Sequence, residues 1–476
     1  MQATSIAQVL QRIFSSRAET SLSRLVRFFV SVSVLMPLGS EAATYYTNNT
    51  GNDSYSCALA QNVGTPKLTI NAGKNCLTKP GDTLIVGDGT YVENEIDMTV
   101  SGAAGSPITI KAEHALLAIL SSTSGNSCGP NIAFYASYIV IDGLRGEINV
   151  ADPACGTNSA AGAFVRMWSS SNPSISGSST TGYVGGVVRN CQVDASSHRG
   201  VGIKTNQDNS LVENCLMHSS LEAFNGINQI FRNNYIDTND AWGDEFTIKG
   251  GARNGQFYNN VLHKTGGWRA LVLGGNSGVA TGIWDTSTAY ECFNCVAYNN
   301  VVVVDSGSGS YALVLAGCYA CAVYNNIVIN GSLNFMKGGD SGGSGPQPFP
   351  ANSIVENNIF YCGGAAAHTG TTYTGFFTED YNNFYTCTGT PSQVHAITGD
   401  PQFLNLQSDW HLSSGSPALG SGVQVSFTSY GGELIDVSKD KTGVVRTAPW
   451  TLGIYAGNSS SSDLTPPSAP KGLTVR

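Results

Sequence analysis

The chain has 476 residues, of which 41% are hydrophobic and only 12% are charged. This length allows one large domain or two to three ordinary ones, and the 56 glycines predict many turns. The formal net charge of −9 excludes a protein that attracts nucleic acid through a general positive charge, so we expect no nucleic-acid partner. An anionic partner would have to meet a local basic patch.

The first 43 residues have the pattern of a secretory signal peptide. Four arginines precede an apolar run from Phe28 to Leu38, and the small residues of "GSEAA" follow, with cleavage expected after Ala42 or Ala43. The run is too short for a stable membrane anchor, and no other stretch of the sequence has membrane-spanning length. We therefore expect a secreted or cell-surface protein in an oxidising compartment, with no stable membrane span after signal cleavage.

A short helix is predicted soon after this segment. The stretch "TINAGKNCL" (residues 69–77) has apolar residues at roughly helical spacing, and Pro80-Gly81 ends it. If the residues that follow form a solenoid, a helix at this place would cover the open end of its core. We interpret this helix as an N-terminal cap.

One short phrase then recurs along the chain. "VAYNNVVV" and "AVYNNIVI" are two of its eight variants, whose first asparagines are Asn190, Asn214, Asn233, Asn259, Asn299, Asn325, Asn357 and Asn382. A repeat near 20–26 residues, made of β-branched strands and Asn/Gly turns, indicates a solenoid, and the leucine frame of leucine-rich repeats is absent. The sequence predicts a parallel β-helix of roughly ten coils over residues 81–430.

The asparagines fit a turn that recurs at the same place in every coil. Asparagine tolerates the left-handed backbone conformation, and stacked asparagine side chains can hydrogen-bond to the coils above and below. A role in sugar binding is the functional alternative. We expect a buried structural ladder.

The cysteines repeat at the same spacings as the asparagines. We therefore predict disulfides between neighbouring coils for the pairs Cys191–Cys215, Cys292–Cys318, Cys295–Cys321 and Cys362–Cys387. Equivalent residues of adjacent coils lie about 4.8 Å apart, which a disulfide accepts. Two further pairs, Cys57–Cys76 and Cys128–Cys155, would then form near the N-terminal end. The two C-x-x-C units "CFNC" and "CYAC" also suit a four-thiolate zinc site, but export favours disulfides.

Charge is concentrated in one part of the chain. From Arg189 to Arg269, 16 of 81 residues are charged, whereas the 67 residues from Ala270 to Met336 contain 3. Alignment of the coils on their asparagines, with alternating side chains, places one set of residues outward on a single face: Lys204, Glu245, Thr247, Lys249 and Arg269. The same alignment places Val201, Ile203, Phe246, Ile248, Ala270 and Val272 inward.

Loop residues flank this predicted face, and several of them suit a carbohydrate ligand. They are His198, Arg199, Asp240, Trp242, Asp244 and Trp268. The two tryptophans could stack on sugar rings, and we assign Lys204, His198, Arg199, Trp242 and Trp268 to substrate binding. The structural alternative is a cross-strand ion pair between Glu245 and Arg269, with lysines that are simply solvated.

The two ends of the repeat region resemble a known superfamily. "TYYTNNTGNDS" and "GDTLIVGDGTYVEN" resemble the start of secreted right-handed parallel β-helix proteins of the pectin-lyase-like superfamily, and "GDPQFLNLQSDWHLSSGSPALGSGV" resembles their closing coil. The resemblance covers residues 44–457 and implies an all-β, right-handed parallel β-helix with caps. Residues 458–476 are a Ser/Pro linker whose end resembles the first strand of a truncated fibronectin type III segment.

The stretch "DEFTIKGGARN…GGWRALVLGG" loosely resembles the chondroitin-B and alginate lyases of that superfamily. The resemblance implies Lys249 as the base that removes the C5 proton of a uronic acid, and Arg269 as the group that serves the leaving oxygen. It also implies Ca²⁺, held by Asp244 and Glu245, to which we add Asp240 as a third acid. A cation is needed to neutralise the uronate carboxylate, and a lysine among cationic neighbours has a lowered pKa.

Three functions remain open on the sequence. The first is a secreted lyase that cleaves a uronate-containing, anionic polysaccharide by β-elimination. The second is a non-catalytic glycan-binding or adhesin-like surface protein. The third is a glycoside hydrolase that uses Asp240, Asp244 and Glu245, although the Asn-Thr-Asp, Asp-Asp and Gly-His-Gly signatures of the polygalacturonases are absent.

Overall fold

The computed structural model describes residues 41–93, 95–121, 131–148, 163–168, 182–195, 201–238, 244–266, 268–275, 290–305, 311–338, 348–370 and 377–457. The signal-peptide and linker predictions, on residues 1–40 and 458–476, therefore lie outside the described residues. No helix within the described ranges is long and apolar enough to cross a membrane.

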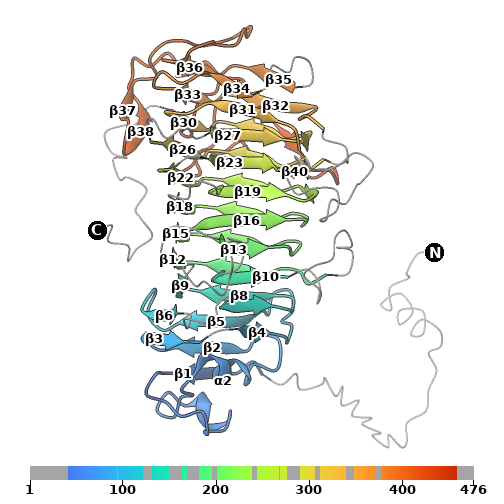
Figure 1. Cartoon of the computed structure of the whole chain (residues 1–476), viewed down its shortest axis with the longest axis vertical. Helices are drawn as coiled ribbons and strands as arrows, with labels where there is room; N and C mark the ends of the chain where they lie inside the picture. The colour runs from blue at the N-terminus through green and yellow to red at the C-terminus, as the bar shows by residue number, and fades with distance from the viewer. Residues whose placement is uncertain are drawn as a thin grey trace, which may run out of the picture. The chain divides into compact units, whose positions relative to one another are not determined.

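Three long parallel sheets account for most of this structure, and the chain visits them in turn (Figure 1). Within the described residues, sheet A has 12 strands: β1 (Thr44–Thr47), β2 (Thr83–Val86), β5 (Ile108–Ala112), β8 (Ile139–Asp142), β11 (Val187–Arg189), β14 (Leu211–Glu213), β17 (Ile230–Arg232), β21 (Gln256–Tyr258), β25 (Val296–Tyr298), β29 (Ala322–Tyr324), β32 (Ser353–Glu356) and β35 (Phe377–Asp380).

Sheet B has 11 strands: β3 (Gly89–Val92), β6 (Ala118–Ser121), β9 (Arg145–Ile148), β12 (Gln192–Ala195), β15 (Leu216–His218), β18 (Tyr235–Thr238), β22 (Val261–Lys264), β26 (Val301–Val304), β30 (Ile327–Ile329), β33 (Ile359–Tyr361) and β36 (Asn383–Tyr385). Sheet C has 10 strands in the part of the chain that the structure describes: β4 (Ile96–Met98), β7 (Ile132–Phe134), β10 (Val165–Met167), β13 (Val201–Thr205), β16 (Ser220–Phe224), β19 (Phe246–Lys249), β23 (Arg269–Gly274), β27 (Tyr311–Ala316), β31 (Leu333–Met336) and β34 (His368–Gly370).

A three-stranded parallel sheet forms the corner between sheets C and A: β20 (Ala252–Arg253), β24 (Cys292–Phe293) and β28 (Cys318–Tyr319). Because every strand pairs in parallel with the equivalent strand of the next coil, the predicted parallel β-helix is confirmed. One continuous apolar core runs inside it. The coils end earlier than predicted, at β36, since two antiparallel pairs follow: β37 (Phe403–Asn405) with β38 (Asp409–Leu412), and β39 (Phe427–Thr428) with β40 (Leu434–Ile435).

The predicted N-terminal cap helix is present as α2 (Ile70–Lys74), preceded by the short 3-10 helix η1 (Leu59–Gln61). The Thr69 side chain accepts a hydrogen bond from the backbone N–H of Ala72, as an N-cap residue does. Ile70 is fully buried in the same core as the inward side chains of the first coil. The helix therefore closes the apolar interior next to β1 and β2.

Two left-handed turns bound each sheet A strand in the middle of the solenoid. The predicted turn residues between sheets A and B have φ between 54° and 62° from Asn190 to Asn357. A second series, not recognised in the sequence, precedes the strand: Asn209, Asn228, Asn254, Asn294, Ala320 and Asn352, with φ between 49° and 56°. In the last coil Tyr381 takes the left-handed position, so the repeat there is displaced by one residue from the predicted Asn382.

The residue that follows each left-handed turn residue between sheets A and B forms the buried ladder. The members are Asn234, Asn260, Asn300, Asn326, Asn358 and Asn382, and all are almost fully buried. Each side-chain oxygen from Asn260 onward accepts hydrogen bonds of 2.9–3.0 Å from the backbone N–H and the amide of the preceding member. An amide suits this position because it donates and accepts at once. The structural interpretation of the asparagines is therefore confirmed for the described coils.

Cys191 and Cys215 occupy the ladder position in the two preceding coils, and their predicted disulfide is wrong: both are buried free thiols. The Cys191 Sγ lies 3.1 Å from the carbonyl oxygen of Arg189, and the Cys215 Sγ lies 3.3 Å from that of Glu213. The amide of Asn260 makes the same contact with the carbonyl oxygen two residues back. Each thiol thus pairs with the carbonyl oxygen of the turn, as the asparagine amide does in other coils. A sequence spacing suited to a disulfide was not sufficient for one to form.

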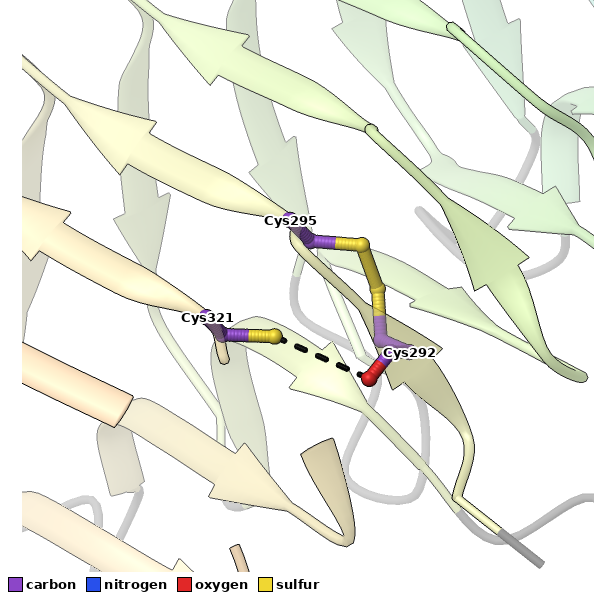
Figure 2. Close-up of side chains that lie close together, drawn as sticks. All are labelled: Cys292, Cys295 and Cys321. Atoms are coloured by element: carbon purple, nitrogen blue, oxygen red, sulfur yellow. Dashed lines mark hydrogen bonds between the residues drawn. A yellow bond between two sulfur atoms is a disulfide. The ribbon is translucent and has the colours of Figure 1, made fainter. Parts of the chain in front are cut away.

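The predicted pairs Cys292–Cys318 and Cys295–Cys321 are also wrong, because Cys292 is bonded to Cys295 (Figure 2). The left-handed residue Asn294 lies between these two cysteines and folds the segment so that their side chains converge, with the Cα atoms 6.2 Å apart. Cys318 and Cys321 are buried free thiols, and the Cys321 Sγ lies 3.7 Å from the Cys292 carbonyl oxygen. The Sγ atoms of Cys292, Cys295 and Cys321 lie within 4.8 Å of one another.

Two predicted disulfides are present, Cys57–Cys76 and Cys362–Cys387. The first joins the segment around η1 to the end of the cap helix, and the second links the last two coils. The pair Cys128–Cys155 lies outside the described residues.

The segment after β36 returns along the outside of the solenoid. We call residues 403–457 the C-terminal strap. Its apolar side chains, Trp410 and Ile454 among them, pack on Val301, Ile327 and Ile359 of sheet B. Another set, which includes Phe427, Val437 and Trp450, packs on the outer side of β25 and β29. The strap therefore covers the corner at which the paired asparagines lie.

Candidate functional site

The charged residues gather on the outer side of sheet C, where three of them meet. The Lys204 Nζ lies 2.8 Å from one carboxylate oxygen of Glu222, and the Lys249 Nζ lies 2.8 Å from the other. The register explains the meeting: Lys204 on β13 lies opposite Glu222 on β16, and Lys249 on β19 lies opposite Phe224, two positions further along β16. The two predicted lysines therefore lie on the same face of sheet C but at different positions along their strands.

The ionisation of this cluster is set by its two lysines. Burial alone would raise the pKa of Glu222, but the charges of Lys249 and Lys204 and their hydrogen bonds lower it to about 2. Burial also opposes the charge of Lys249, but Glu222, and then Asp244, raise its pKa above the ordinary value. We expected a lowered pKa for Lys249 among cationic neighbours. That expectation is wrong, because its nearest partner is a carboxylate.

A second ion pair lies one coil further on. Arg269 holds Asp244 through two bonds, of 2.6 Å from Nε and 2.8 Å from Nη2. Both side chains are about 10% exposed. A bidentate guanidinium–carboxylate pair fixes the orientation of both groups, so the free electron pairs of Asp244 are largely committed to Arg269.

The cationic stretch extends in the other direction to Arg166 on β10. Its register partner is Lys204. Burial lowers the pKa of Arg166, and the Glu222 carboxylate is the charge that most opposes this effect. Over β10 to β23, four described cations, Arg166, Lys204, Lys249 and Arg269, therefore share two carboxylates, Glu222 and Asp244. Sequence reasoning missed both Arg166 and Glu222.

Aromatic rings stand at both ends of this charged face. The Arg166 guanidinium lies 4.6 Å from the ring centre of Trp168, which is stacked near Tyr135. At the other end the Arg269 guanidinium lies 5.3 Å from the ring centre of Trp268, which meets Tyr311 edge-on. Trp268 was predicted to flank the face and does so. Among the described residues, the four cations thus lie between aromatic rings at the two ends of the face.

Glu245 does not belong to the face, contrary to the prediction. Its side chain is fully buried, and Lys264, also fully buried, is the charge that most offsets its burial. Burial raises the pKa of Glu245 well above the ordinary value. The strict alternation of a strand holds only from Phe246 onward, and Glu245 precedes β19 at the corner where the chain turns inward.

The predicted inward set needs two further corrections, the first at Val201, which is only half-buried and lies outside the apolar core cluster. Phe246 pairs with Leu271 and Ile248 with Leu273, so Leu271 and Leu273 are the inward residues of β23. Val272 lies opposite Thr247 on the outer side, in a small separate apolar cluster with Val314. Ala270 is in the core as predicted.

The calcium site inferred from the resemblance does not fit the described residues. Glu245 faces the interior, whereas Asp244 is held by Arg269 on the outside. Their carboxylates therefore do not face a common site, and we derive no step through a calcium ion. Four other predicted residues, His198, Arg199, Asp240 and Trp242, lie outside the described residues.

Comparison with known proteins finds similar solved structures but no matching family model. No family model matches the sequence, and no curated protein matches it. The structure is similar to a pectate lyase, Pel9A, with 14% identity over 88% of this chain and 97% of that chain and a TM-score of 0.47. It is similar to a rhamnogalacturonan lyase with 13% identity over 77% and 91% of the two chains and a TM-score of 0.42. A complex of XylC with xylose has 10% identity over 87% and 99% and a TM-score of 0.45. At these identities no residue of this chain receives a role from them.

Proposed function

We propose that the outer face of sheet C binds an acidic polysaccharide. The observation that carries the proposal is the excess of charge: four cations on the coils of β10 to β23 share two carboxylates, in a protein whose net charge is −9. An acidic protein gains nothing from long-range attraction to a polyanion, so binding rests on contacts at this face. A chain laid along the axis of the solenoid meets these cations one after another.

The rings near the face support a saccharide rather than a simple anion. Trp268 is partly exposed and lies next to Arg269, so a sugar ring stacked on this tryptophan would place its carboxylate or sulfate near a guanidinium. Arginine suits such groups because it offers paired donors in one plane. The ligand class that fits is a uronate or sulfated polysaccharide.

Binding without cleavage is the best supported activity. A general base must lose its proton near neutral pH, and Glu222 raises the pKa of Lys249 instead. A hydrolase needs a protonated carboxyl as acid, yet the pKa of Glu222 is about 2 and Asp244 is paired with Arg269. β-Elimination remains the second candidate because Lys249 and Arg269 lie on neighbouring strands of one face and influence each other electrostatically.

Titration with alginate, pectate and dermatan sulfate, followed by calorimetry, tests the proposal. We expect Lys249→Ala and Arg269→Ala each to weaken binding about tenfold, with a loss of affinity at high salt. Lys111→Ala is the matched control, because Lys111 is exposed on sheet A and should leave binding unchanged. Equal affinity of wild type and Lys249→Ala for every polymer, or no binding at all, would contradict the proposal.

The same polymers decide between binding and cleavage. An unsaturated product, detected by its absorbance and lost in Lys249→Ala, would establish β-elimination and overturn the purely binding function. We further propose that the protein acts outside the cytoplasm, with which the disulfides Cys57–Cys76 and Cys362–Cys387 are compatible.

A further inference from the structure

A second surface with a different chemistry lies at the corner between sheets C and A. Arg253, Phe293 and Tyr319 occupy equivalent positions of β20, β24 and β28, so they form one column along the solenoid. Tyr290 adds a ring 5.1 Å from Tyr319. At the other end, the Arg253 guanidinium lies 5.3 Å from the ring centres of both Phe293 and Tyr430, which comes from the C-terminal strap.

The rings of this column are accessible at both ends. Tyr430 is 68% exposed and Tyr319 is 36% exposed. Neither ring is needed to fill the core, and the backbone N–H of Tyr430 is fixed by a 2.8 Å hydrogen bond to the Asn254 side chain. The strap therefore places one ring in line with rings supplied by the coils.

A groove of about 390 Å³ lies beside this column, between sheet A and the strap. One wall carries amides of successive coils, Asn209, Asn228 and Asn254, and the other carries the carboxylates of Glu433 and Asp436. The amides are hydrogen-bonded in series, Asn228 to Asn209 and Asn254 to Asn228, so their spacing follows the coils. Apolar atoms of Ile230 and Leu434 complete the lining.

We infer that the column and the groove form a binding site for a neutral, hydroxyl-rich polysaccharide. Pyranose rings have apolar faces that stack on aromatic rings and hydroxyl groups that pair with amides and carboxylates. Aromatic rings in line along the solenoid suit a polymer rather than a single sugar. Asp436 forms an ion pair with Lys439 at 3.2 Å, but the carboxylate of Glu433 repels an anionic chain, so the ligand differs in class from the acidic polysaccharide proposed for sheet C.

Affinity electrophoresis through gels that contain hydroxyethylcellulose, galactomannan or arabinoxylan tests this site. We expect at least one of these neutral polymers to retard the wild-type protein. Tyr319→Ala and Tyr430→Ala should each weaken that binding roughly fivefold, since each substitution removes a ring on which a sugar would stack. Glu433→Gln, which keeps the shape of the groove but removes its charge, should weaken it by a similar factor.

Two controls separate this site from the charged face. Tyr385→Ala removes a ring from a pair on sheet B and should not change the retardation. Lys249→Ala should affect the acidic polymers alone, and Tyr319→Ala the neutral ones alone. Thermal unfolding of each variant verifies that it folds. If Tyr430→Ala lowers the stability of the strap, the result for Tyr319→Ala, which lies on a coil, decides whether the site binds the polymer. Absence of retardation by all three neutral polymers, or unchanged retardation of Tyr319→Ala and Glu433→Gln, would overturn the inference.

Discussion

The outer surface of the solenoid is built in two ways. Over β10 to β23, sheet C presents ion pairs and partly exposed cations, such as Lys249 with a side chain 24% exposed. Over β25 and β29, the outward residues of sheet A are Val296, Tyr298, Ala322 and Tyr324, and the strap buries them. The inward residues of both regions are similarly apolar. The difference shows that outward positions decide whether a coil stays open to a ligand or receives a second layer of chain.

The covered region should be the more sensitive to loss of a single polar side chain. Asn326→Ala removes an amide that accepts from the backbone and side chain of Asn300 and donates to Asn358 and to the Ala297 carbonyl oxygen. We expect a loss of about 4 kcal/mol in the free energy of unfolding, because several buried groups lose their partners. Asn209→Gly, at an exposed left-handed turn residue before sheet A, should cost less than about 1 kcal/mol. Urea unfolding of both variants checks the contrast, and equal losses would refute it.

A buried arginine of the covered region should differ in the same direction from an exposed arginine elsewhere on sheet A. Arg446 of the strap is 4% exposed, and its guanidinium donates to Asn299 and to the carbonyl oxygens of Thr451, Gly453 and Tyr455. Arg446→Met should destabilise the protein by about 3 kcal/mol, since these acceptors are left buried and unpaired. Arg189→Met, at a side chain 42% exposed in an ion pair with Asp142, should cost under about 1 kcal/mol. Denaturation curves that rank the two arginines the other way would contradict this assignment.

The open face should carry an acid-sensitive contribution to stability. The folded pKa of Glu222, about 2, lies below its ordinary value, so its stabilising effect is fully present above about pH 4.5 and is lost as the pH falls towards 2. Glu222→Gln should lower the stability at pH 7 by about 2 kcal/mol, because two lysines lose their common partner. The difference between wild type and variant should shrink in that acidic window. A difference that is constant from pH 7 to pH 2 would be inconsistent with this account.

The covered region should respond to alkali instead. Burial lowers the pKa of Lys441 to about 7, and its ammonium group lies against the Asn259 carbonyl oxygen. The unfolded lysine holds its proton up to about pH 10.5, so wild-type stability should rise between pH 7 and 10.5, by at most about 1.4 kcal/mol per unit. Lys441→Met should abolish this pH dependence, and its gain in the free energy of unfolding over wild type should be largest at or below pH 7. The stability of wild type relative to the variant, measured at pH 6, 8 and 9.5, should increase; a flat difference would exclude the effect.

The smallest effect is expected where the ladder changes from asparagine to cysteine. Cys215→Asn would extend the series of amides by one coil, because the Cys215 N–H already donates to the Asn234 side chain at 3.0 Å. We expect a change within about 1 kcal/mol, with a gain if the new amide reaches the Asn234 oxygen. Cys215→Ala, which supplies no donor, is the matched control and should be less stable than Cys215→Asn. The reverse order in thermal unfolding would show that the thiol is the better fit.

The sequence predicted those features that repeat. The asparagine repeat from Asn190 to Asn357 predicted the parallel β-helix and its left-handed turns. The same alignment placed Lys249 and Arg269 correctly on one face. Glu222 was missed because its coil, only 19 residues long between Asn214 and Asn233, lacks the lysine on which the alignment depended. Glu245 was misplaced because alternation ends where a strand does. The strap was not predicted to cover the coils, since its contacts with Asn299 and Asn357 have no period along the chain.

The strap also sets an order of events in folding. Each coil pairs with a neighbour about 19 to 40 residues away, so coils can add one by one to a growing stack. The bond from Arg446 to Asn299 spans 147 residues, and that from Lys441 to Asn259 spans 182. Contacts so distant in sequence form slowly and late in synthesis. Until then the outward faces of β25 and β29 stay uncovered. The strap, which is synthesised after these coils, packs on them once they have formed.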